Sequence, residues 1–285
     1  MKKTLIFLLA LSGAAMADYV WKGGENITTD KWANQSNWEL TNSSEWKING
    51  SGPGTTNSGM WNSIRISNAS GIIGANNDTR GKIEGWTLDL TLKSTDLTIT
   101  WIAKFQGGCT LDIDQKSSLT ISEYWGGNDG GAITLNNRGS FTLGYSIRQQ
   151  GGNGFNMNLY DTGVVHFTAQ NTTGANSAKV ASVAAQLTGA TDSVLTRTLI
   201  TIDQQGDHSV AFDSTATTYN FTDANGNALT AVDSLEALNA ATTSSYFVTK
   251  DSTGLSVSYK LIPEPTTATL SLLALAGLAA RRRRR

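Results

Sequence analysis

Cysteine, histidine and proline are scarce in this chain of 285 residues, and each shortage excludes a class of protein. Cys109 is the only cysteine, so no disulfide can form within the chain. The two histidines, His166 and His208, belong to no His/Cys cluster; this argues against a transition-metal site, and we expect no cofactor. Of the three prolines only Pro53 precedes residue 263, so little would interrupt continuous hydrogen-bonded strands.

Basic residues are also few once the two ends of the chain are set aside. Residues 1–17 and 265–285 hold 7 of the 22 basic residues and none of the 23 acidic ones. Residues 18–264 therefore carry 15 basic and 23 acidic side chains, a net charge of −8. Nucleic acid and anionic membrane surfaces are poor partners for such an acidic body.

Motifs of known catalytic sites are missing as well. No nucleophile elbow, phosphate loop, EF-hand loop or HExxH pattern is present. Asp112 and Asp114 are predicted to project from the same face of one strand, but polar residues that alternate with leucine and isoleucine are typical of a solvent face. Asp203, Asp207 and His208 predict a polar surface loop. We expect no enzyme, although carboxylates from different segments can meet in space without a sequence signal.

The C-terminus does carry a distinctive pattern. Pro263, Glu264 and Pro265 precede fifteen uncharged residues, 266–280, and then a block of arginines. A polar triplet, an apolar stretch and terminal positive charge would stall a translocating chain with its tail in the cytoplasm. Fifteen helical residues span roughly 22 Å, less than the roughly 30 Å of a bilayer core, which favours a transient anchor. The alternative is an ordinary C-terminal tail anchor. The expected cytoplasmic stop is Arg281, Arg282, Arg283, Arg284 and Arg285.

This segment, residues 263–285, closely resembles the PEP-CTERM sorting signal of Gram-negative bacteria. The resemblance rests on the triplet, its spacing, the Leu/Ala/Gly-rich stretch and the arginine block. It implies processing by an exosortase, a membrane-embedded cysteine transpeptidase, through a transient inner-membrane intermediate. It also implies a destination at the cell surface, the outer envelope or the extracellular matrix. It says nothing about what the body of the protein does there.

The N-terminus has the three regions of a secretory signal peptide. Lys2 and Lys3 precede an apolar run, residues 5–11, and a small-residue A-x-A sequence ends at Ala17. This pattern predicts a signal peptide over residues 1–17 with cleavage between Ala17 and Asp18.

Short alternating segments recur in pairs within the body. The two members of a pair begin 8 residues apart, and corresponding members of successive pairs begin 22 or 24 residues apart. The same spacing places Ile64 22 residues before Trp86. These segments begin at Leu97, Leu111, Leu119, Ile133, Phe141, Met157 and Val165.

The spacing predicts an all-β fold, a single-stranded parallel β-helix or solenoid with coils of about 22 residues, over residues 63–225. Apolar residues at i and i+2 form half-buried strands that are too short to bury a face alone, but an identical face in each coil can stack on the next. Glycine-rich and Asn/Asp-rich clusters occur where each coil must turn. An all-β sandwich is the main alternative, but it does not need an equal recurrence. His166 alternates with apolar neighbours and is expected to face outward.

Both ends of such a solenoid need caps, because the backbone N–H and C=O groups of its terminal strands would otherwise stay unpaired. Residues 18–62 hold five of the eight tryptophans and predict an N-terminal cap. Their spacing resembles the tryptophan-rich opening of autotransporter-like and PEP-CTERM surface proteins. Residues 226–262 predict a C-terminal cap. It comprises a helix over Ala228–Ala241 and a β-hairpin whose turn is Asp251–Gly254.

The sequence therefore predicts an exported structural or adhesive protein of the cell surface or exopolysaccharide matrix. One alternative is a glycan-binding module, because tryptophan faces stack on sugar rings. Trp86, Trp101 and Trp125 lie on or beside successive coils and are the candidates for contact with a polysaccharide or mucin-type glycan. The other alternative is a polysaccharide lyase or hydrolase built on a β-helix scaffold, which would need a carboxylate pair or a proton-abstracting base.

Overall fold

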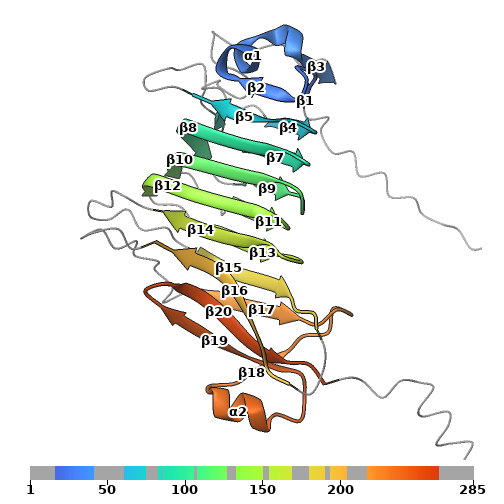
Figure 1. Cartoon of the computed structure of the whole chain (residues 1–285), viewed down its shortest axis with the longest axis vertical. Helices are drawn as coiled ribbons and strands as arrows, with labels where there is room; N and C mark the ends of the chain where they lie inside the picture. Colours follow the sequence, from blue (N-terminus) through green and yellow to red (C-terminus); the bar gives the residue numbers. More distant parts are fainter. Residues whose placement is uncertain are drawn as a thin grey trace, which may run out of the picture.

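Strands of successive coils lie side by side along the molecule and build an all-β solenoid (Figure 1). The computed structural model describes residues 17–41, 61–74, 83–85, 87–105, 108–126, 133–149, 154–168, 180–189, 193–203 and 217–262. In this part of the chain each coil contributes one strand to each of two sheets, and neighbouring coils pair in parallel. The predicted parallel β-solenoid is therefore confirmed.

The first sheet has nine strands and the second has eleven. In spatial order the first sheet consists of β17 (Thr218–Thr222), β15 (Val180–Gln186), β13 (Phe155–Leu159), β11 (Ile133–Asn137), β9 (Thr110–Ile113), β7 (Thr87–Lys93), β4 (Trp61–Ser67), β1 (Ala17–Trp21) and β3 (Trp38–Thr41). The second consists of β18 (Thr230–Ala231), β19 (Ser245–Asp251), β20 (Gly254–Lys260), β16 (Leu195–Ile202), β14 (Val164–Thr168), β12 (Ser140–Gln149), β10 (Ser118–Gly126), β8 (Asp96–Phe105), β5 (Ser70–Ile73) and β2 (Asn26–Thr28), with β6 (Ile83–Gly85) also paired to β8.

Alternating side chains create the core between the two sheets. In β11 and β13 every second residue is buried, as the period of two along a strand requires. Leu111, Leu135 and Met157 pair in successive coils of the first sheet, and none of the three is exposed to solvent. Opposite them, Leu119, Phe141 and Val165 are likewise stacked and buried in the second sheet. These continuous apolar stacks stabilise the solenoid, because no single coil could bury its face alone.

The predicted register is right in the second sheet and wrong in the first. Leu97, Leu119 and Phe141 pair 22 residues apart, as expected. In the first sheet, however, Leu111 pairs with Leu135 rather than Ile133.

A second register prediction is also wrong, because Ile64 pairs with Leu90, 26 residues on, rather than with Trp86. A shift by an even number of residues, two at Leu111 and four at Ile64, leaves the same side chains facing inward, so the alternation alone could not distinguish these registers.

Tryptophans pack together at the N-terminal end of the solenoid. Trp21, Trp32 and Trp38 are buried, and the ring of Trp38 lies 4.9 Å, centroid to centroid, from each of the other two. Trp32 lies in α1 (Thr29–Ala33), which Thr28 caps, and the short helix η1 (Gln35–Asn37) follows. β1 and β2 pair in parallel with β4 and β5, so the residues of the predicted cap continue the parallel ladder, and β3 adds to it in antiparallel.

The C-terminal part of the second sheet changes direction. β20 pairs antiparallel with β16 and with β19, which forms the predicted hairpin. The predicted helix over Ala228–Ala241 is wrong in extent, because α2 covers only Leu235–Ala240. Ser234 caps its start by accepting the N–H of Ala237, whereas β18 just before it pairs with β19. The residues of β18, which the predicted helix included, thus form a strand instead.

Candidate functional site

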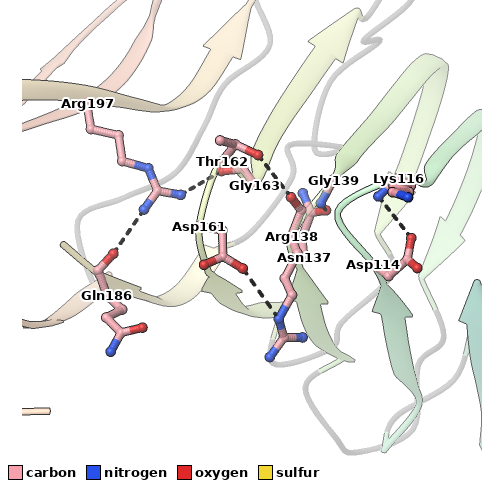
Figure 2. A network of polar contacts seen from close by, with 10 residues as sticks. All are labelled: Asp114, Lys116, Asn137, Arg138, Gly139, Asp161, Thr162, Gly163, Gln186 and Arg197. Atoms are coloured by element: carbon pink, nitrogen blue, oxygen red, sulfur yellow. Dashed lines mark hydrogen bonds and ion pairs between the residues drawn. The ribbon is translucent and has the colours of Figure 1, made fainter. Parts of the chain in front are cut away.

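The turns that join the two sheets line up along one edge of the solenoid and hold a network of polar contacts (Figure 2). We name this set the polar corner: the turns 114–117, 137–139 and 160–163, together with Arg197 of β16. Each turn follows a strand of the first sheet and precedes one of the second. Polar side chains from several coils come together there.

Asp114 fixes the first turn of the polar corner. Its carboxylate accepts hydrogen bonds from the N–H groups of Ser94 (3.1 Å) and Lys116 (3.0 Å) and from the Ser117 hydroxyl (2.6 Å). Burial alone would raise the pKa of Asp114, but these hydrogen bonds and the nearby Lys116 charge outweigh it, so the pKa lies below its ordinary value. Because Ser94 belongs to the preceding coil, Asp114 ties two coils together.

Asn137 is the buried polar residue of the second turn. It occupies an inward position, between Ile113 of the preceding coil and Leu159 of the next, and its side chain is fully buried. Its amide nitrogen donates to the carbonyl of Val164 (2.8 Å), and its amide oxygen accepts the N–H of Gly139 (3.0 Å). Both polar groups are thus satisfied, as a buried amide requires.

Two glycines let the turns stack closely. A Cβ at Gly139 would overlap the carbonyl oxygen of Ser117, and a Cβ at Gly163 would overlap that of Asn137. Glycine is therefore needed where one turn lies directly on the backbone of the preceding one.

Arg138 and Arg197 face different surroundings at the polar corner. Arg138 lies 4.6 Å from the centre of the Tyr160 ring, and its Nε is 3.7 Å from the Asp161 carboxylate. Both members of that ion pair are about half exposed, so the pair contributes little stability. Arg197 instead donates to two backbone carbonyls, those of Gly163 (3.0 Å) and Gln186 (3.2 Å).

Burial lowers the pKa of Arg197, against the Coulombic effects of Tyr259 and Asp161, but a guanidinium stays charged at neutral pH. Arg197 therefore links the turn at Gly163 to the end of β15, the next strand of the first sheet. The two hydrogen bonds that Arg197 donates, like those that Asp114 and Asn137 accept, are made with the protein itself. The contacts of the polar corner therefore attach neighbouring coils to one another.

A second polar surface covers the outer side of the first sheet. We name it the polar strip: Asp112, Asn136, Asn156 and Asn158, which are all half-buried. Asp112, Asn136 and Asn158 occupy the same register position in successive coils, and Asn158 donates to the side-chain oxygen of Asn136 (2.8 Å). Asn156 accepts the Ser182 hydroxyl (2.8 Å). Amide and carboxylate groups at regular spacing can hydrogen-bond with hydroxyl-rich ligands.

The titratable side chains singled out in the sequence lie at separate places in the structure. Asp112 faces outward from β9, whereas Asp114 lies beyond the end of that strand in the polar corner, so the prediction that both project from one strand face is wrong. His166 is partly exposed, as predicted, and its Nε2 lies 3.0 Å from Oδ2 of Asp203, although no hydrogen bond joins them. Asp207 and His208 lie outside the described residues.

The predicted processing sites lie at the limits of the described chain. Ala17 and Asp18 belong to β1, where Asp18 pairs with both Thr41 and Ser63. The triplet Pro263, Glu264 and Pro265 and the arginines 281–285 lie outside the described residues.

The tryptophans proposed for glycan contact are only partly described. Trp86 lies outside the described residues, whereas Trp101 and Trp125 have described backbones in β8 and β10. The register pairs Trp125 with Lys104, and even without the shift of one residue between Ile121 and Glu123 its partner would be Ala103 rather than Trp101. The two tryptophans are therefore not directly opposite each other on neighbouring strands.

The described part of the chain has neither a candidate metal site nor a membrane-spanning helix. No group of three or more His, Cys, Asp or Glu side chains that could hold a metal ion occurs there. Among the same residues, no helix has the length and apolar character needed to span a bilayer. No protein-family model, no curated protein and no solved structure matches this chain.

The sequence analysis did not identify Asn137, the buried polar residue of the polar corner. Asn137 interrupts a run of apolar inward positions, and Arg138-Gly139 follows it directly. An asparagine at an inward position just before a glycine is a signal that could have identified this turn.

Proposed function

We propose that this chain is an exported structural or adhesive protein, sorted through a PEP-CTERM-like signal and displayed at the surface or in the extracellular matrix of a Gram-negative bacterium. The observation that carries the proposal is the triplet, apolar stretch and arginine block of residues 263–285, directly behind a solenoid with a signal-peptide pattern at its other end. The partner for processing is an exosortase, with the inner membrane as a temporary location.

The architecture suits a protein that presents a surface rather than one that catalyses a reaction. The coils are attached to one another at the polar corner by Asp114, Asn137 and Arg197 as well as by the sheet ladders. Such a solenoid resists bending, because displacement of one coil would break contacts to both neighbours. The acidic body and the polar strip would keep this rod solvated in an aqueous matrix.

A second candidate function is glycan binding, and the polar strip favours it. Asp112, Asn136 and Asn158 recur on neighbouring strands, which lie about 4.8 Å apart in a sheet. A polysaccharide or mucin-type glycan offers hydroxyl groups that amides and carboxylates can bind. The strip would then act as the adhesive surface of the same displayed rod.

Replacement of the triplet tests the sorting proposal. In an exosortase-containing host, we expect the Pro263→Ala, Glu264→Ala, Pro265→Ala variant to remain in the inner membrane with its arginine tail intact. Cell fractionation and intact mass measurement would detect this precursor. Thr266→Ala with Thr267→Ala is the matched control, because it alters adjacent residues and leaves the triplet unchanged. Normal maturation of the triplet variant would refute the assignment, and an uncut wild-type chain in the membrane would indicate a tail anchor instead.

A further inference from the structure

The folded body holds its last described residue firmly. The N–H of Ile262 donates to the Ser244 hydroxyl (2.9 Å), and that hydroxyl lies 3.4 Å from the Ile262 carbonyl oxygen, which accepts from it. The carbonyl of Ser244 in turn accepts the N–H of Thr230 (3.0 Å), next to β18 and β19. Hydrogen bonds therefore hold Ile262, which we call the exit point, to the body.

Few residues separate this exit point from the apolar stretch. Only residues 263–265 lie between Ile262 and Thr266. Even a fully extended chain covers at most about 3.6 Å per residue, so these two residues lie no more than roughly 14 Å apart. A membrane segment that begins at Thr266 therefore keeps the exit point within that distance of the bilayer.

Helix α2 lies beside the exit point. The ammonium group of Lys260, two residues before Ile262, donates to the carbonyls of Asn239 and Ala241, both at 2.9 Å. These bonds attach the C-terminal end of the helix to the end of β20. In Figure 1, α2 lies at the end of the molecule beyond the hairpin of β19 and β20.

Leu235, the first residue of α2, is an exposed apolar side chain at this end. It is 49% exposed, whereas Leu238, one turn later, is fully buried and anchors the helix to the body. Among the residues whose exposure is described, the other exposed large apolar one is Ile72, on β5 towards the opposite end of the solenoid (Figure 1). Leu235 and Ile72 therefore allow the two ends of the solenoid to be compared.

We propose that the end of the body formed by α2 and the β19–β20 hairpin lies against the lipid headgroups in the anchored precursor, with Leu235 at the contact. This inference rests on the proposed function, because it requires residues 266–280 to lie in the membrane. The short tether, rather than affinity, brings the surface to the lipid, since it creates a high local concentration of headgroups. Removal of the tether therefore abolishes the contact.

A fluorescent probe at each exposed residue tests this geometry. The full chain is reconstituted into vesicles of phosphatidylethanolamine and phosphatidylglycerol after labelling of a Leu235→Cys or Ile72→Cys variant. Cys109 is buried, so the native protein is labelled at the new cysteine. A quencher is attached to the lipid headgroup. We expect the emission at position 235 to fall at least about twofold more than at position 72, because the tether limits the exit point to roughly 14 Å from the bilayer.

Two controls separate the inference from the function on which it rests. A chain that ends at Ile262, shown to be folded by circular dichroism, should show no quenching at either position with the same vesicles. Full chain that floats with the vesicles but shows equal or no quenching at the two positions would overturn the inference and leave the membrane anchor intact. Full chain that fails to float with the vesicles would overturn both.

Discussion

Asn137→Asp is the most discriminating test of the polar corner. The substitution preserves size and shape but removes the amide donor that faces the Val164 carbonyl at 2.8 Å. The other oxygen can still accept the N–H of Gly139. At neutral pH the variant therefore holds a carboxylate in a fully buried position, directly opposite a carbonyl oxygen.

The loss of stability depends on whether the introduced carboxyl is ionised or protonated. An uncompensated buried charge costs about 3–5 kcal/mol, and since one hydrogen bond remains we expect a loss of about 3 kcal/mol in the free energy of unfolding at pH 7. When the introduced carboxyl is protonated it can donate to the Val164 carbonyl, so the loss should fall to about 1 kcal/mol. The difference of about 2 kcal/mol corresponds to a pKa raised by about 1.5 units in the folded state.

The direction of the pH dependence is fixed by linkage. Burial raises the pKa of the introduced carboxyl in the folded protein above its unfolded value of about 3.9, so the folded state holds the proton more tightly. The variant is therefore closest to wild type below that unfolded pKa. It loses stability as the pH rises through the folded pKa, and the loss is complete by pH 7.

Urea unfolding followed by circular dichroism, at pH 4 and pH 7, measures the effect against wild type at each pH. Asn156→Asp is the matched control, because this half-buried outward asparagine only accepts a hydrogen bond from Ser182, which a carboxylate also accepts. We expect it to change stability by less than about 0.5 kcal/mol. Equal losses for the two variants, or a loss at Asn137 that does not grow with pH, would refute the reasoning.

Two further predictions concern Asp114 of the polar corner and the tryptophans that are candidates for glycan contact. Asp114→Ala should destabilise the protein by about 1 kcal/mol, like the loss of a helix cap, because the N–H of Ser94 loses its acceptor, whereas outward Asp112→Ala should be nearly neutral. Because the pKa of Asp114 is lowered by folding, its contribution is present above the unfolded pKa and disappears as the pH falls through the folded pKa, so the two variants should converge in acid urea titrations. If glycan binding occurs, residues 18–262 should bind on a glycan array and lose binding in Trp101→Ala or Trp125→Ala; unchanged binding would exclude the tryptophans as contacts.

The sequence was sufficient to predict which side chains face inward, but not where each coil begins. Strand alternation identifies Leu111, Leu135 and Met157 as core residues in any register that shifts by two. The register depends on the length of the turns. Four residues separate β9 from β10, but only Arg138 and Gly139 separate β11 from β12. The constant spacing of 8 residues concealed this difference.

Asn137 explains how a turn two residues shorter can fit the same stack. It takes the inward position that Ile113 and Leu159 occupy in the neighbouring coils, and its amide bridges the space to Val164 and Gly139. This role depends on contacts between coils that are distant in sequence, and so local propensity could not reveal it. The same holds for Arg197, whose carbonyl partners lie 11 and 34 residues away.

The two proposed cuts differ in when they can occur. The bond between Ala17 and Asp18 lies within β1, which is hydrogen-bonded to β3 and β4 in the folded protein. A protease that needs an extended, free substrate must therefore act there before β1 pairs. The PEP triplet, by contrast, follows Ile262, the last described residue, whose N–H donates to Ser244. If the proposed sorting holds, exosortase processing would therefore act on a folded rod that the short tether already keeps at the membrane.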